Sequence, residues 1–159
     1  MLKKLILITI LFHLHNFASA ANVEEKKGLK VKERFSSNLF IIKDAKASTV
    51  ILSHGSAGVW KHTYMWKDRL INEGYNVIII DHHTEKGIKP HIGRRDYKDF
   101  PEERVKDLLK LSRWIKKQRW NKGKIGVIGF SYGGAGTNLL ANNLELGLMK
   151  DFKKKDKKL

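Results

Sequence analysis

The chain contains a serine in a setting that is typical of a reactive nucleophile. Ser131 is the centre of G-F-S-Y-G (129–133), which follows the apolar run K-I-G-V-I-G-F (124–130). In a G-x-S-x-G elbow, a sharp turn between a strand and a helix presents the serine hydroxyl, and the glycines let the two elements approach closely. The backbone N–H of the next residue, Tyr132, then faces the oxygen that becomes negatively charged. The pattern predicts attack by Ser131 on an acyl carbon, whereas the alternative is a glycine-rich turn without chemistry.

A second stretch, S-H-G-S-A-G (53–58), is suited to stabilise the same oxygen. Serine hydrolases with this elbow take a second oxyanion donor from the loop after an earlier strand, often of the H-G-x type. We expect the backbone N–H of Ser56 to be this donor, with that of Gly55 as the alternative. His54 is expected to brace the loop through hydrogen bonds and not to act as a base.

The residues that should activate Ser131 are not found where the elbow requires them. An elbow serine is followed in the chain by its Asp or Glu and then by its His. The stretch after Ser131 contains Asp151 and Asp156 but no histidine. Without a base, a serine hydroxyl is a poor nucleophile. We therefore predict little activity from this chain alone.

Several histidines precede the serine, and they leave two weaker alternatives open: His62, His82, His83 and His91. One of the adjacent pair, His82 or His83, could approach Ser131 through the loop that follows it. The same pair with Asp81 could bind a metal, although adjacent side chains point in different directions. We expect neither arrangement.

The elements that would position these residues alternate between strand and helix. Short apolar or β-branched runs predict strands, and apolar residues at helical spacing predict the helices between them. This order predicts an α/β fold with a mostly parallel sheet and helices on both faces. In such sheets the chemistry gathers at the carboxyl ends of the strands. The predicted strands are 39–42, 48–53, 76–81 and 124–130, and the predicted helices are 60–73, 102–119 and one that begins after Gly133 and Gly134.

The ends and the apolar faces of two helices can also be predicted. The first helix should end at Gly74, a typical C′ residue, and it carries apolar or aromatic side chains at Trp60, Tyr64, Leu70 and Ile71. The second should begin after Asp99 as its N-cap, with Pro101 in its first turn. Its apolar stripe consists of Val105, Leu108, Leu109, Trp114 and Ile115.

The composition excludes some classes of protein. The chain has no cysteine, which removes disulfides, Cys–zinc sites and cysteine nucleophiles. Its 32 Lys and Arg against 16 Asp and Glu give a formal net charge of +16. These basic residues are spread along the chain, apart from a C-terminal cluster, and no arginine-rich arm accompanies them. We therefore interpret them as a solvated surface and do not expect a nucleic-acid partner.

The N-terminus has the features of a secretory signal peptide. Lys3 and Lys4 precede an apolar run at 5–14, and the small residues A-S-A-A follow at 18–21. The apolar run is shorter than the roughly 20 residues that a spanning helix needs. We predict cleavage after Ala20 and export to the periplasm or medium of a bacterium, with no stable membrane span; an uncleaved anchor is the alternative. The predicted organisation is a signal peptide at 1–20, a charged, loose or edge segment at 21–35, the main domain at 36–148 and a Lys-rich tail at 149–159.

The order of these motifs resembles the dienelactone hydrolase-like branch of the α/β-hydrolases. The resemblance covers roughly residues 48–147 and rests on H-G-S-x-G, G-Y-N-V-I-I-I-D-H, R-x-x-D (Arg104 and Asp107) and G-F-S-Y-G-G. It implies hydrolysis of a small ester, lactone or similar acyl substrate through an acyl-serine intermediate, without a metal or organic cofactor.

The chain departs from this family pattern after the elbow helix. The family fold continues with further strands that carry the catalytic Asp and His, so we expect a truncated copy that contains only the N-terminal part of the domain. Such a chain would expose an apolar edge, and we expect self-association or pairing with a complementing C-terminal chain. The alternative function is an exported, basic binding protein that keeps the fold without the chemistry.

Overall fold

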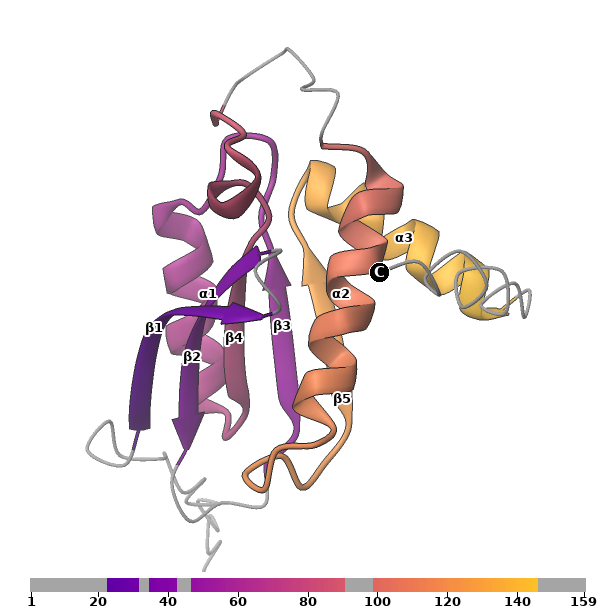
Figure 1. The fold of residues 1–159 in the computed structure, drawn as a ribbon. Helices are drawn as coiled ribbons and strands as arrows, with labels where there is room; N and C mark the ends of the chain where they lie inside the picture. The colour runs from indigo at the N-terminus through magenta and orange to yellow at the C-terminus, as the bar shows by residue number, and fades with distance from the viewer. Residues whose placement is uncertain (1–22, 32–34, 43–46, 91–98, 146–159) are drawn as a thin grey trace, which may run out of the picture.

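The computed structural model describes residues 23–31, 35–42, 47–90 and 99–145. Within these residues the chain forms a five-stranded sheet with the order β1-β2-β4-β3-β5 (Figure 1). The strands are β1 (Val23–Val31), β2 (Phe35–Ile42), β3 (Thr49–Ser53), β4 (Asn76–Asp81) and β5 (Ile125–Gly129). The helices are α1 (Lys61–Asn72), the short 3₁₀ helix η2 (Thr84–Lys86), α2 (Pro101–Ile115) and α3 (Tyr132–Glu145). The predicted α/β class is confirmed; the sheet itself is mixed, with two parallel and two antiparallel strand pairs.

The pairing of the strands brings the segments that follow β3, β4 and β5 to the same end of the sheet. β3 pairs in parallel with β4 on one side and with β5 on the other, whereas β2 is antiparallel to both β1 and β4. The carboxyl ends of β3, β4 and β5 therefore lie side by side. Three segments begin at these carboxyl ends: the loop 54–58, the residues after Asp81 and the elbow at Ser131.

Side chains of the central strand β4 alternate between two apolar clusters. Val77 and Ile79 pack in the cluster that contains Ile71 of α1. Ile78 and Ile80 pack in the cluster that contains apolar residues of α2 and α3. Helices thus cover both faces of the sheet, and this is why the run N-V-I-I-I-D is apolar without alternation.

The apolar and aromatic residues at α1 differ in their exposure. Ile71 is buried, and Gly74 ends the helix as predicted, with a φ of +84°. Trp60 and Tyr64, however, are 58% and 39% exposed. Trp60 is the N-cap and precedes the first turn. The buried residues of the helix are Thr63 and Ile71, which therefore define the side facing the sheet.

The start of α2 also corrects one prediction. Pro101 is the first helical residue, as expected, but the N-cap is Phe100 and not Asp99. No side chain caps this helix. The Asp99 carboxylate instead accepts hydrogen bonds from the buried Arg104, one turn into the helix. A buried guanidinium requires a counter-charge, and this requirement prevails over the capping preference.

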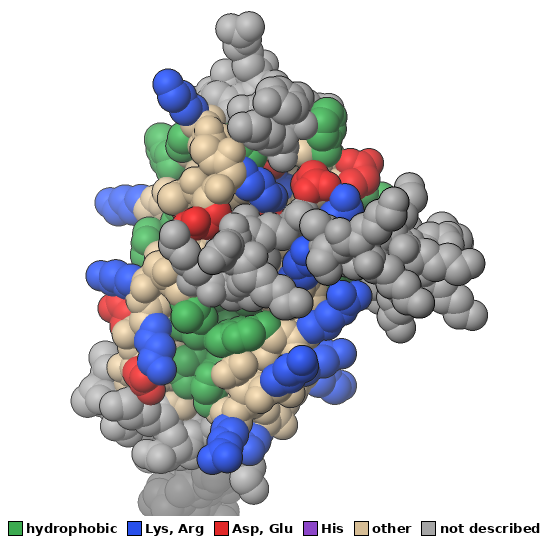
Figure 2. Space-filling view, viewed as in Figure 1, with side chains coloured by type: hydrophobic (Ala, Val, Ile, Leu, Met, Phe, Trp, Pro, Cys, Tyr) green, Lys and Arg blue, Asp and Glu red, His purple; other side chains and the backbone are tan. Residues whose placement is uncertain are grey.

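On the face of the molecule that Figure 2 draws, Lys and Arg side chains lie along both flanks and near the lower end. The charged segment expected at 21–35 contributes β1, which lies at one edge of the sheet. The predicted leader, His91, Asp151 and Asp156 lie outside the described residues. Among the described helices, none is long and apolar enough to cross a membrane.

We predict that the 159-residue chain self-associates through β5. In the described sheet β5 pairs only with β3, so its other side presents unpaired backbone groups. Gly126 lies in β5 and is exposed, and a Cβ added there meets no atom within 4 Å. We expect Gly126→Lys to shift sedimentation velocity profiles toward the monomer across a concentration series, because a lysine on an edge strand opposes pairing.

The matched control is Asn72→Lys, which adds the same charge at an exposed position of α1. An effect of equal size from both substitutions would show that net charge, and not the β5 edge, governs association. A monomeric wild-type chain at every concentration would contradict the prediction itself.

Candidate active site at the carboxyl edge of the sheet

Ser131 lies on a strained turn between β5 and α3. Its φ of +50° is the only positive φ among the described residues other than glycine. This left-handed conformation is uncommon for a residue with a side chain and is typical of a nucleophile elbow. The residue is exposed. The residue that the sequence pattern singles out therefore has the backbone conformation of such a turn.

Two glycines make this turn possible because backbone atoms lie where a Cβ would be. A Cβ on Gly129 would lie within 3.0 Å of the carbonyl of Gly133 and of Thr137 Oγ1. A Cβ on Gly133 would lie within 3.0 Å of the carbonyl oxygens of Ser53 and His54. The start of α3 thus packs directly on the end of β3.

The loop 54–58 lies against the elbow. Gly58 donates its backbone N–H to the carbonyl of Gly55 at 3.2 Å, which closes a tight turn in which Gly58 has a φ of +82°. A Cβ placed on Gly55 would lie 3.2 Å from the Cβ of Ser131 and 3.7 Å from its Oγ. The two segments predicted to supply the oxyanion donors are therefore adjacent.

His54 has the bracing role predicted from the sequence. Its ring is fully buried, its Nδ1 donates to the carbonyl of Gly55 at 2.6 Å, and its Nε2 accepts the backbone N–H of His82 at 3.1 Å. Burial first, and then the charge of nearby His82, lower the pKa of His54 to about 3. The imidazole is neutral at pH 7, and both of its nitrogens are engaged.

His82 belongs to a second buried group of polar residues. Its Nδ1 lies 2.8 Å from Asp107 Oδ2 and its Nε2 lies 3.0 Å from Ser53 Oγ. Lys86 adds a donor to the same carboxylate at 2.6 Å. Burial lowers the pKa of His82 despite the neighbouring carboxylate. Burial alone would raise the pKa of Asp107, but the hydrogen bond from His82 and the charge of Lys86 hold it below its usual value.

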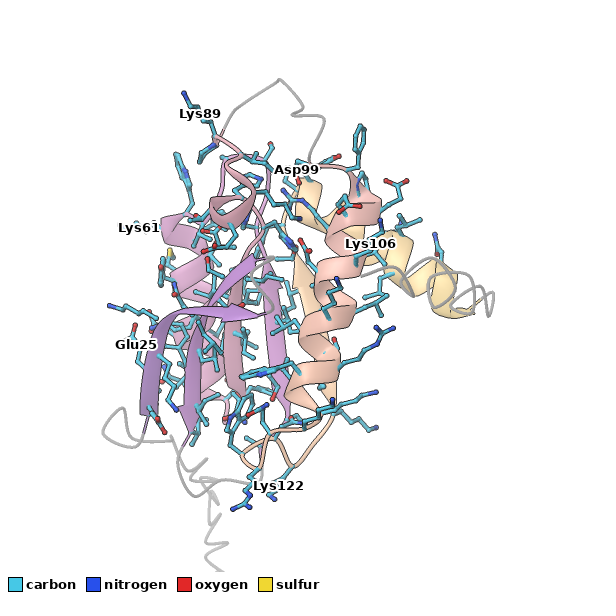
Figure 3. All side chains as sticks on the ribbon, in the orientation of Figure 1. Glu25, Lys61, Lys89, Asp99, Lys106 and Lys122 are labelled. Carbon is cyan, nitrogen blue, oxygen red and sulfur yellow. The ribbon has the colours of Figure 1, made fainter. Side chains whose placement is uncertain are left out.

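His83 and Arg104 form a third group around Asp99, which lies beside the start of α2 (Figure 3). His83 Nε2 lies 2.9 Å from Asp99 Oδ2. Arg104 binds both oxygens of the carboxylate, with Nε at 2.7 Å from Oδ1 and Nη2 at 2.8 Å from Oδ2. These bonds hold the pKa of Asp99 well below its usual range, although burial acts to raise it.

The described histidines that precede the elbow have partners other than Ser131. His82 faces Ser53 and His83 faces Asp99, and no hydrogen bond joins either ring to Ser131 within the described part of the chain. His62 contacts the ring of Phe130 at a centroid distance of 4.9 Å. Among the described residues, no three His, Cys, Asp or Glu side chains are grouped to hold a metal ion. Asp81 instead accepts the backbone N–H groups of the two residues that follow His82.

The buried charges of α2 were not predicted as parts of the site. Arg104 and Asp107 are fully buried, one turn apart on the face that also buries Val105, Leu108 and Leu111. Their position in the sequence could have indicated their burial, because both charged residues lie within the apolar stripe of an amphipathic helix. Charges on such a face are buried only with partners.

Comparisons with known proteins agree with the fold. Residues 17–149 match the family of X-Pro dipeptidyl-peptidases (S15 family). A protein of Klebsiella pneumoniae subsp. pneumoniae MGH 78578, provisionally assigned as a dienelactone hydrolase, is 22% identical with a TM-score of 0.57 over 75% of this chain and 53% of its own. An esterase of Pyrococcus furiosus is 25% identical with a TM-score of 0.50 over 72% of this chain and 44% of its own. No curated protein matches the sequence.

The strand order and these structural matches define an α/β-hydrolase fold of the dienelactone hydrolase-like type over its N-terminal part, as the sequence predicted. The chain belongs to the X-Pro dipeptidyl-peptidase (S15) family. It spans about half the length of the solved structures that it matches.

We predict opposite effects for two adjacent glycines at the start of α3. Gly133→Ala should lower the free energy of unfolding by about 3 kcal/mol or more, because its Cβ would overlap the carbonyls of Ser53 and His54. Gly134→Ala is the matched control. Its Cβ would lie 3.4 Å from the nearest atom, so it should be neutral or stabilise the helix by up to about 1 kcal/mol. Urea unfolding measures both, and equal effects would contradict the observed packing.

We also predict that stability falls as the pH is lowered below 6.5. The folded state keeps His54 neutral down to pH about 3, whereas the unfolded chain binds a proton near pH 6.5. The unfolded state therefore binds more protons within this window, and the free energy of unfolding falls by up to about 1.4 kcal/mol per pH unit for each such histidine. The lowered pKa values of Asp81, Asp99 and Asp107 add to the loss below pH 3.8.

Urea unfolding between pH 4 and 8 measures this dependence. His54→Gln should flatten the curve below pH 6.5, even if it lowers stability overall, because the buried imidazole is gone. His62→Gln, which removes an exposed histidine of α1, is the control. A wild-type stability that does not change between pH 7 and 4 would contradict the prediction.

Proposed function

We propose that this chain carries the nucleophile part of a serine hydrolase that acts on an ester, lactone or similar acyl bond. The observation that supports this most strongly is the left-handed φ of the exposed Ser131 at the junction of β5 and α3, directly against the loop 54–58. Backbone strain of this kind is retained where the surrounding structure enforces it, and it is common at active sites.

In the proposed reaction, Ser131 Oγ attacks the carbonyl carbon of the substrate. The carbonyl oxygen becomes an oxyanion that accepts hydrogen bonds from the backbone N–H groups of Tyr132 and Ser56, with Gly55 as the alternative donor. The bond to the leaving group then breaks and an acyl-serine is formed, which water hydrolyses. Tyr132 begins α3, so the helix dipole also favours negative charge at this point.

The proton of Ser131 has no acceptor among the described side chains. His54, His82 and His83 are buried and have other partners. A positioned general base contributes about 10²–10⁴-fold to the rate of such a reaction. We therefore propose that the chain alone is a weak catalyst and that full activity needs a base from outside the described residues, supplied by a complementing segment or chain.

The substrate class follows from what the similar proteins share. The family name refers to a dipeptidyl-peptidase, and the solved structures are named for lactone and ester hydrolysis. All three names describe transfer of an acyl group to water. We propose a small-molecule ester or lactone as substrate and an exported location, in keeping with the leader predicted at 1–20.

A fluorophosphonate probe tests the proposed nucleophile. Attack by Ser131 forms an Oγ–P bond, and the P–F bond breaks as fluoride and the hydroxyl proton leave. We expect slow, stoichiometric labelling of the chain, which Ser131→Ala abolishes, and mass spectrometry of the labelled peptide should place the adduct on Ser131.

Ser56→Ala is the matched control, because the proposed donor is its backbone N–H and not its hydroxyl. This variant should be labelled at the wild-type rate. Labelling that persists in Ser131→Ala, or a folded wild-type chain that does not react at all, would sink the proposed function for this chain.

A further inference from the structure

We propose that Arg104 is a positioning residue that holds the two halves of the proposed oxyanion site at a fixed separation. One half is the loop 54–58, which contains Ser56 and Gly55, and the other is the elbow with Tyr132. This inference rests on the proposed function and assigns a role in it to a side chain that does not touch the reacting atoms.

The Arg104 side chain contacts both halves directly. Its Nη1 donates a hydrogen bond to the carbonyl oxygen of His54, at the start of the loop. Its guanidinium carbon lies 4.9 Å from the centre of the Tyr132 ring, within the range of a cation–π contact. The peptide group after His54 and the residue after Ser131 are therefore both held by one planar group.

Asp99 fixes the orientation of this planar group. It accepts two hydrogen bonds from the guanidinium, from Nε to one oxygen and from Nη2 to the other, at 2.7 and 2.8 Å. Tyr132 in turn donates its hydroxyl to the backbone carbonyl of Asp99 at 2.7 Å. Arg104, Asp99 and Tyr132 thus contact one another in a closed ring. Arg104 contacts the face of the Tyr132 ring, and Asp99 accepts the Tyr132 hydroxyl.

The neighbouring residues pack closely around Arg104 and bury it. The side chain is fully buried. A Cβ on Gly136 would lie 3.1 Å from the Cβ of Arg104, so α3 approaches α2 closely at this point. Arg104 cannot serve as a solvated surface charge. The planar fork of its guanidinium binds both oxygens of Asp99 and still contacts the His54 carbonyl and the Tyr132 ring, a geometry that a lysine does not reproduce.

The consequence for catalysis follows from the geometry of oxyanion stabilisation. The two backbone donors must lie about 2.7–3.1 Å from the position of the oxyanion. A displacement of about 1 Å by a distant substitution can cost about 10²-fold in rate. Loss of the Arg104 contacts should therefore lower the rate of reaction at Ser131 and leave the initial binding of a small probe almost unchanged.

The test measures fluorophosphonate labelling over a range of probe concentrations, which separates the maximal rate from the half-saturating concentration. Arg104→Met should lower the maximal rate by about 10–100-fold with less than about a twofold change in half-saturation. Arg104→Lys should recover part of the loss. Lys106→Met removes a cation of the same helix that pairs with Glu103 on the partly exposed side, and it should label at the wild-type rate (Figure 3).

A milder variant covers the case in which Arg104→Met does not fold. Tyr132→Phe removes only the hydroxyl that binds the carbonyl of Asp99, and it should lower the maximal labelling rate by several-fold. In parallel, ¹H–¹⁵N spectra should show that the Ser56 and Tyr132 amide signals shift or broaden in both variants and not in Lys106→Met.

The outcomes separate this inference from the proposed function. If the wild type labels at Ser131 and neither Arg104→Met nor Tyr132→Phe changes the maximal rate, Arg104 does not position the site and the proposed nucleophile stands. If the folded wild type does not label, the proposed function fails. The amide signals of Ser56 and Tyr132 alone then test whether Arg104 positions the two segments. Unchanged Ser56 and Tyr132 signals in both variants would then overturn the positioning role.

Discussion

The buried ion pair between Arg104 and Asp99 is the interaction on which the rest of the site depends. Removing a guanidinium and a carboxylate from water costs several kcal/mol per ion unless hydrogen bonds satisfy both groups. Here the guanidinium binds both carboxylate oxygens and the carbonyl of His54. Satisfying this one cation therefore fixes the start of α2, the beginning of the loop 54–58 and the ring of Tyr132 relative to one another.

The same requirement explains why two adjacent histidines have different partners. His82 and His83 follow Asp81 at the end of β4, where the chain bends and His83, in the αR conformation, precedes η2. His82 meets Asp107 and Ser53, whereas His83 meets Asp99 and Arg104. Each of the two buried carboxylates, Asp99 and Asp107, is thus matched to one imidazole. The polar edge of the sheet is built from paired groups, and it consolidates the loops that carry the elbow and its neighbour.

The sequence could predict those features that depend on local patterns. The four apolar strands, the turn at Ser131 and the end of α1 at Gly74 follow from periodicity and from glycine. The exposure of Trp60 and Tyr64 could not be predicted, because it depends on which side of α1 meets the sheet. The partner of Asp99 was also out of reach, since an aspartate before a helix is usually a cap and only the fold brings Arg104 to it.

Two serines at this edge show that residue types alone do not define a hydrolytic site. Ser53, His82 and Asp107 are hydrogen-bonded in the order of a Ser–His–Asp triad, at 3.0 and 2.8 Å, but all three are fully buried. No substrate carbonyl can reach Ser53, so this arrangement stabilises the end of β3. Ser131 has the exposure and the strained turn that Ser53 lacks, but no imidazole among the described residues. Because the interior side of the elbow is already filled by paired groups, a base for Ser131 has to approach from its exposed side.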